Sequence, residues 1–98
     1  MPDDFLIPPF DAAAALATLR RSLRDLQLAE REGVFELRGQ PVARLKVDGA
    51  TLAADLARRL SRAPEWDART IKDHADLRRF TDELRKRLAR WSDAREDN

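Results

Sequence analysis

The only histidine of the chain, His74, is the first candidate for acid–base chemistry near neutral pH. A catalytic histidine needs a partner that converges on the same reacting atom, and the neighbouring carboxylates of Asp73 and Asp76 lie too close in sequence to do so. No serine or threonine stands in a nucleophile motif, and the three glycines do not form a phosphate-binding loop. We therefore expect a solvated histidine in the first turn of a helix, with pH sensing as the alternative, and no enzyme.

Metal ligands and redox-active residues are equally sparse. The chain has no cysteine, so neither a disulfide nor a thiolate metal site can form. One histidine among scattered carboxylates is a poor ligand set. Many carboxylates stand at ion-pairing positions instead, such as Asp82 before Lys86 and Glu83 before Arg87. The sequence predicts no catalytic residue, no metal, no cofactor and no small-molecule ligand.

Basic side chains are the remaining group that could bind a ligand. The 19 lysines and arginines nearly balance the 18 carboxylates, but residues 34–62 hold six basic and three acidic residues. Such a local excess could contact a phosphate backbone, with a solvated surface as the alternative. Neither tryptophan lies within the predicted patch, so stacking of single-stranded bases is not expected. The candidate nucleic-acid patch consists of Arg20, Arg21, Arg38, Arg44, Lys46, Arg58 and Arg59.

A long amphipathic helix over residues 12–32 is the first element that would position these cations. Asp11 stands where an N-cap residue accepts hydrogen bonds from the first turn, and Gly33 suits the left-handed conformation that often ends a helix. Before it, residues 5–7 form a short apolar run that could be an edge strand. The apolar side chains of the helix recur every three or four residues and share one face: Ala12, Leu16, Leu19, Leu23 and Leu26.

A β-hairpin follows, with strands over about 34–38 and 42–47 and a turn at Gly39-Gln40. Apolar and charged residues alternate along both strands, so Phe35 and Leu45 lie on one face and Arg44 on the other. Two strands alone are marginally stable, so the apolar face is expected to pack on helices.

The segment after the hairpin has two interpretations. Asp48-Gly49 could close a second hairpin and make residues 50–54 a strand. The spacing of four between Leu52 and Leu56, and the many alanines, favour a helix over about 50–62 instead. We take the helix as the prediction.

The last third of the chain is predicted to be helical. A short helical turn after Pro64 would carry Trp66, and the segment 70–73 has the form of a capping box before a helix over about 72–91. The expected fold class is α+β: a long N-terminal helix, a β-hairpin, then two or more C-terminal helices packed on one face of the hairpin.

Three amphipathic helices and one ribbon offer more apolar surface than one small core can bury. A second copy of the chain could bury the surplus, and two tryptophans suit such an interface. The candidate interface residues are Leu16, Leu19, Leu23, Leu26, Trp66 and Trp91. We therefore expect a non-catalytic protein–protein interaction module that forms a homodimer.

The length of 98 residues predicts a single small domain over 1–98, with 1–4 and 92–98 disordered. No apolar run approaches the roughly 18 residues needed to span a bilayer, so no membrane association is expected. The acidic N-terminus lacks the basic region of a signal peptide, and the chain has no cysteine. These features predict a cytoplasmic protein.

The run Arg38-Gly39-Gln40-Pro41-Val42-Ala43-Arg44-Leu45 resembles the hairpin of Phd/YefM-type antitoxins, in which a Gly-x-Pro-Val-Ala run closes a ribbon after an amphipathic helix. The resemblance implies an N-terminal part that dimerises and binds operator DNA, and a C-terminal segment that wraps and neutralises a toxin. It would give Gly39, Pro41 and Ala43 the role of holding the hairpin. It would assign DNA contacts to the basic groups near Arg20, Arg21, Arg38 and Arg44. A DNA-binding, antitoxin-like repressor is therefore the alternative function.

Overall fold

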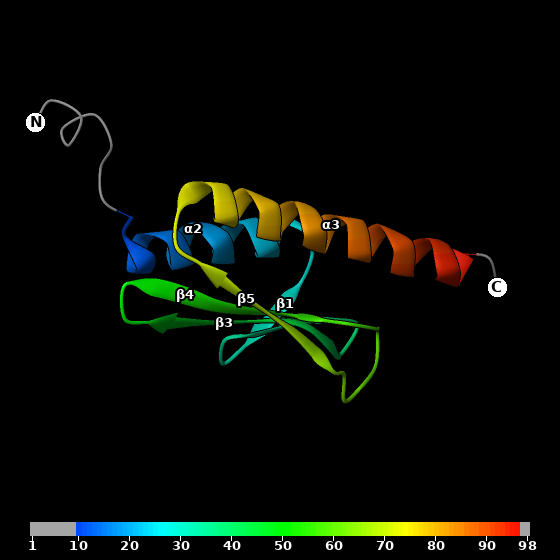
Figure 1. Cartoon of the computed structure of the whole chain (residues 1–98). Helices are drawn as coiled ribbons and strands as arrows, with labels where there is room; N and C mark the ends of the chain where they lie inside the picture. Colours follow the sequence, from blue (N-terminus) through cyan, green and yellow to red (C-terminus); the bar gives the residue numbers. More distant parts are fainter. Residues whose placement is uncertain (1–9, 97–98) are drawn as a thin grey trace, which may run out of the picture.

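The computed structural model describes residues 10–96 and has two layers, a five-stranded antiparallel sheet and two helices that cover one of its faces (Figure 1). The strands lie in the sheet in the order in which they occur in the sequence. The run 1–4, predicted to be disordered, and the run 5–7, predicted as a possible edge strand, lie outside the described part. The last two residues, 97–98, also lie outside it. The elements are α2 (Ala12–Asp25), β1 (Ala29–Arg31), β2 (Val34–Leu37), β3 (Gln40–Asp48), β4 (Thr51–Ala57), β5 (Trp66–Ile71) and α3 (His74–Glu96).

The first helix begins as predicted and ends earlier. Asp11 is its N-cap and accepts a hydrogen bond from the Ala14 amide at 3.1 Å. The predicted end at residue 32 is wrong, because Gln27 adopts a left-handed φ of 71° and the Leu28 amide donates to the Leu23 carbonyl. This is a Schellman ending, which Leu28 stabilises by packing into the core beside Leu23. The chain then turns into β1 instead of continuing the helix.

Three two-residue turns build most of the sheet. Glu32-Gly33 and Arg38-Gly39 have positive φ at both central residues, as type I′ turns require, and Gly49-Ala50 begins with a positive φ at Gly49. Gly33 therefore serves a hairpin turn and not the end of a helix. The predicted pairing of β2 with β3 is present, with its turn one residue earlier than expected.

The predicted helix over 50–62 is wrong, and the alternative hairpin interpretation is the correct one. Thr51–Ala57 is strand β4, paired with β3 from Ala43↔Leu56 to Asp48↔Thr51. Leucines four residues apart share a face in a strand as well as in a helix, so their spacing could not distinguish the two structures. The predicted helical turn at Trp66 is wrong too, because Trp66 opens strand β5. The α+β class is correct, but the predicted layout of a β-hairpin covered by two or more C-terminal helices is wrong. One helix precedes a five-stranded sheet in the chain, one helix follows it, and both cover the same face (Figure 1).

The predicted capping box over 70–73 would begin the second helix at Thr70. The residue that caps this helix is Asp73, three positions later. Asp73 accepts from the Asp76 amide at 2.8 Å, and Asp76 accepts from the Lys72 amide at 3.2 Å, which satisfies free amides on both sides of the helix start. The helix continues to Glu96, past the predicted end at Trp91.

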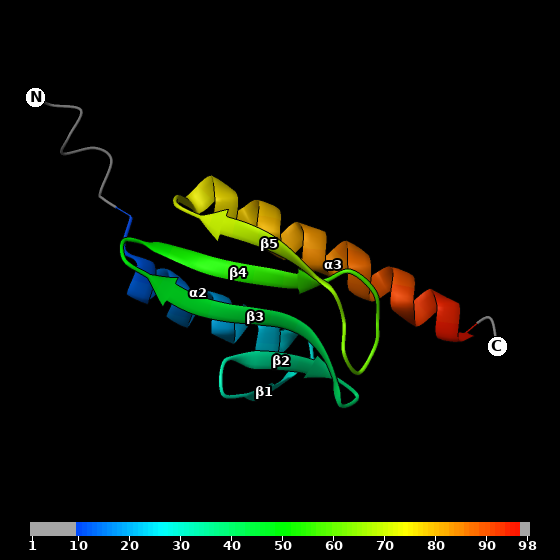
Figure 2. The same cartoon turned by 60° about the horizontal axis from the view of Figure 1, so that its bottom comes forward.

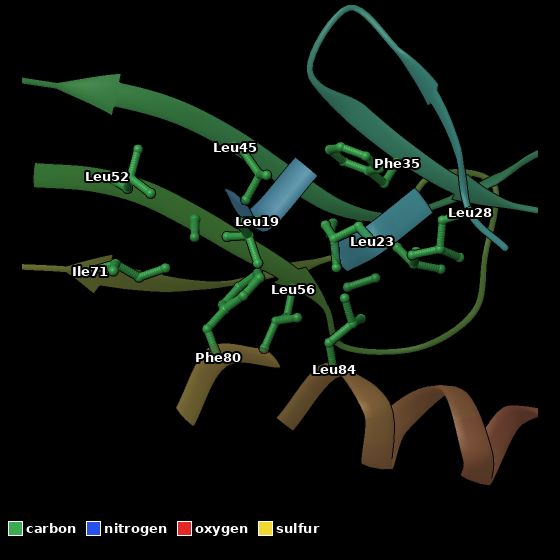
Figure 3. Packing of buried hydrophobic residues seen from close by; sticks show 14 of the residues in the cluster. Leu19, Leu23, Leu28, Phe35, Leu45, Leu52, Leu56, Ile71, Phe80 and Leu84 are labelled. Atoms are coloured by element: carbon green, nitrogen blue, oxygen red, sulfur yellow. The ribbon is translucent and has the colours of Figure 1, made fainter. Parts of the chain in front are cut away.

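The core lies between the helices and one face of the sheet (Figure 3). Leu19 and Leu23 of α2 and Leu84 of α3 are at most 1 % exposed, so both helical stripes are buried within a single chain. Val47, at 38 %, is the only exposed large apolar residue among the described residues. The expected surplus of apolar helix surface is therefore not observed.

Candidate binding surface

The face of the sheet opposite the helices is uncovered in the described part of the chain (Figure 2). Residues paired across an antiparallel sheet project to the same side, which fixes the members of each row. One row crosses all five strands, and the rows beside it end on β5. We call the residues of these rows that are at least partly exposed the open face: Arg31, Val34, Arg44, Lys46, Asp48, Thr51, Ala53, Asp55, Trp66, Ala68 and Thr70.

The centre of the open face holds an ion pair stacked on an aromatic ring. Arg44 of β3 donates to Asp55 Oδ2 from Nε at 3.0 Å and from Nη2 at 2.7 Å. The Arg44 guanidinium also lies 4.2 Å from the centre of the Trp66 ring. The prediction that neither tryptophan lies within the basic patch is therefore wrong for Trp66. The helical turn predicted at Trp66 hid this contact, because Trp66 reaches Arg44 only as part of strand β5, which lies beyond β4 in the sheet.

The structure separates the seven predicted cations of the nucleic-acid patch. Arg44 and Lys46 lie on the open face, while Arg38 occupies the β2–β3 turn. Arg58 and Arg59 follow β4, where Arg58 is 3.0 Å from Asp67 and 3.3 Å from Glu65. The other two, Arg20 and Arg21, lie on α2 in the helical layer.

The predicted interface residues are mostly committed to the fold. Leu19, Leu23 and Trp91 are buried in the core, the last at 9 % exposure. Leu16 and Leu26 are partly buried against that core. Of the six predicted interface residues, Trp66 alone lies on the open face.

An ion network joins β5 to α3 on the helical side of the sheet. Arg87, whose side chain is 13 % exposed, donates to Asp67 at 3.0 Å, to Glu83 at 2.6 Å and to the Ala57 carbonyl at 2.9 Å. Hydrogen bonds from Arg58 and Arg87 lower the pKa of Asp67. Sequence spacing predicted the Glu83–Arg87 pair but could not reveal the links between elements.

Arg69 completes that network at its other end. It donates to both carboxylate oxygens of Glu83, at 3.1 and 2.8 Å, and this interaction is the main reason that the pKa of Glu83 is lowered. The carboxylates are thus held ionised by arginines. This arrangement ties the edge strand to the helix and leaves neither carboxylate free to accept a proton from a substrate.

The lone histidine lies on the surface beside an aromatic ring. His74 is exposed at the start of α3, and its ring meets Phe10 edge-on with 5.5 Å between ring centres. Within residues 10–96, no group of three or more His, Cys, Asp or Glu side chains is placed to hold a metal ion. No helix in that part of the chain has the length and apolar character to cross a membrane.

Comparison with known proteins adds no further identification. No protein family model, curated protein or solved structure matches this chain.

Proposed function

We propose that this protein is a non-catalytic protein–protein interaction module that forms a homodimer through the open face of its sheet. The observation that carries the proposal is the asymmetry of the two sheet faces. Two helices cover one face, and nothing among residues 10–96 covers the other, although it presents Arg44 on the central strand stacked on the ring of Trp66. Tryptophan and arginine are enriched in protein interfaces and provide much of their binding energy.

The charges of the open face permit two copies to pair. Arg31 and Lys46 are exposed cations, and Asp48 is an exposed anion on the same face. Two copies related by a two-fold axis would present the same surface to each other, so a mixed-sign surface can pair cation with anion. Small side chains at Ala53 and Ala68 let a second surface approach the backbone closely.

The size of the face predicts a weak dimer. Five strands about 4.8 Å apart, with about six residues of 3.3 Å each, give a face of roughly 480 Å². A standard interface buries about 800 Å² per partner. The dimer is therefore expected to dissociate on dilution.

Sedimentation equilibrium from low micromolar to near-millimolar concentration tests this proposal. The wild type should rise from monomer to dimer mass. Ala53→Glu should remain a monomer, because it places a carboxylate in the interface, while its cross-strand neighbour Lys46 keeps the fold stable. Ala89→Glu, on the exposed side of α3, is the matched control and should dimerise like the wild type. A monomeric wild type, or an Ala53→Glu protein that dimerises normally, would refute the proposal.

The second candidate is an antitoxin-like, DNA-binding repressor, for which the favouring observation is the set of free cations at the sheet. Lys46, Arg38 and Arg59 form no ion pair with another described residue. This function predicts duplex binding that weakens steeply with salt. Arg38→Ala should weaken it more than Arg44→Ala, because Asp55 already neutralises Arg44. Equal binding of all variants at low salt would exclude this candidate.

A further inference from the structure

The exposed side of α2 carries a cup lined by arginines, which belongs to the helical layer and not to the open face. The cup has a volume of about 260 Å³ and is lined by Ala17, Arg20, Arg21 and Arg24. These positions follow the helical spacing i, i+3, i+4 and i+7, so they form one stripe. The short Ala17 side chain leaves a hollow among three long ones.

A carboxylate from the sheet fixes two of the three guanidinium groups. Glu30 of β1 lies 2.9 Å from Arg20 Nε and accepts a hydrogen bond from Arg24 Nη2 at 2.9 Å. Burial alone would raise the pKa of Glu30, but the hydrogen bonds from Arg24 and Arg20 lower it overall, so it stays ionised. Arginines already held in place lose less side-chain entropy when a ligand binds.

The charge of the cup is matched to a doubly charged anion. Glu30 pairs with the guanidinium groups of Arg20 and Arg24, and Arg21 forms no ion pair with any described residue. The nearby Asp25 is exposed and also makes no ion pair within the described part. Among the side chains that line the cup and the one carboxylate paired with them, about two positive charges remain. A phosphomonoester carries about −1.5 to −2 at pH 7, whereas a phosphodiester of a nucleic-acid backbone carries −1.

We propose that this cup is a binding site for a phosphomonoester or inorganic phosphate dianion, held by the guanidinium groups of Arg20, Arg21 and Arg24 around Ala17. Arginine suits this ligand because its planar fork can donate two parallel hydrogen bonds to phosphate oxygens. Arg21 supplies free donors, and the braced pair supplies oriented ones. The site lies on the helical layer and not on the open face, so the proposal does not depend on the proposed homodimer.

The test follows amide shifts of the isotope-labelled protein by NMR during ligand titrations at constant ionic strength. Phenyl phosphate should shift residues 17–24 and Glu30 with saturation, and dimethyl phosphate should bind at least about tenfold more weakly. Binding should weaken as the pH falls below about 6, where the monoester takes up a proton. Diester binding equal to monoester binding, or shifts spread over the whole surface, would overturn the proposal and favour nonspecific or nucleic-acid contacts.

Two further titrations, with inorganic phosphate and with a short phosphoserine peptide, identify the source of the phosphate. Inorganic phosphate binding as tightly as a short phosphoserine peptide would assign the cup to the free ion. Tighter binding of the peptide would assign it to a phosphate carried by a protein.

Variants with matched controls separate the cup from general surface charge. Ala17→Glu fills the hollow with a carboxylate that can pair with Arg21 four residues later, and should abolish binding without harm to the helix. Ala13→Glu adds the same charge one turn away and should bind like the wild type. Arg21→Gln should weaken binding about tenfold, whereas Arg78→Gln on α3 should not. Undiminished binding by Ala17→Glu would refute the site.

Discussion

Replacement of Arg87 by methionine should destabilise the protein far more than the loss of a surface charge would suggest. Arg87 joins α3 to β5 through Asp67 and to β4 through the carbonyl of Ala57, and it also donates to Glu83 one turn earlier on α3. Its side chain is 13 % exposed, and Ala57 is fully buried at 0 %. Methionine keeps much of the apolar stem and removes only the guanidinium.

The magnitude follows mainly from the Ala57 carbonyl. A hydrogen bond from a charged donor contributes about 1.5–3 kcal/mol, and this one is made to the carbonyl of a residue that is fully buried beneath Arg87. The carboxylates of Asp67 and Glu83 add less, because each keeps another arginine, Arg58 or Arg69. We expect a loss of about 2–3 kcal/mol, which corresponds to a fall in Tm of roughly 10–20 °C for a domain of this size.

Urea denaturation followed by tryptophan fluorescence and circular dichroism measures this loss. Arg85→Met is the matched control, because Arg85 is two positions away on the same helix, 60 % exposed and 4.0 Å from an exposed Asp82. It should change stability by less than about 0.5 kcal/mol. An Arg87→Met protein no less stable than Arg85→Met would show that the network does not hold α3 to the sheet.

Three further predictions use the same denaturation assay. Gln27→Gly should stabilise the protein by about 0.5 kcal/mol, because glycine accepts the left-handed φ of 71° without strain; a loss of stability would contradict the Schellman ending. Leu84→Ala should cost about 2–5 kcal/mol and Leu88→Ala less, since Leu84 is 0 % exposed and Leu88 only partly buried; equal losses would contradict this packing. Asp67 and Glu83 have lowered pKa values in the folded state, so their contribution is present above their usual values of 3.8 and 4.5 and is lost as the pH falls through and below them. Stability should therefore hold from about pH 7 to 5 and decline towards pH 3, and an unchanged midpoint at pH 3 would refute this.

Features that depend only on residues close together in the sequence were predicted correctly. The N-cap at Asp11 and the apolar stripe through Leu19 and Leu23 depend only on neighbours along the chain, and both are present. The ends of elements were harder to predict, because the Schellman turn at Gln27 uses a residue that rarely adopts positive φ.

The prediction of the second half of the sheet failed because the leucine spacing fits a helix and a strand equally well. Leu52 and Leu56 share a face in either a helix or a strand, and the intrinsic preference of alanine for helices then misdirected the prediction. The Asp48-Gly49 turn signal was the better guide. Tertiary pairing with β3 and β5 on both sides of β4 outweighs the weak propensity of its alanines.

The candidate surface could be predicted only in part. Alternation along β3 placed Arg44 and Lys46 together on the charged side of a ribbon, as observed. The contacts of Arg44 with Asp55 and Trp66 could not be predicted, because they depend on the register of strands that were not recognised. The arginine cup depends likewise on the arrival of β1 beside α2.

The order of the strands also sets the sequence of events by which this protein can fold. Every strand pairs with its neighbour in the chain, and three of the four connections are two-residue turns. Closing such short loops costs little chain entropy, so each hairpin can form on its own and extend the sheet strand by strand. The packing of α2 beside α3 joins opposite ends of the chain and has the largest loop to close. The sheet is therefore expected to form rapidly, with the meeting of the two helices as the late and rate-limiting step.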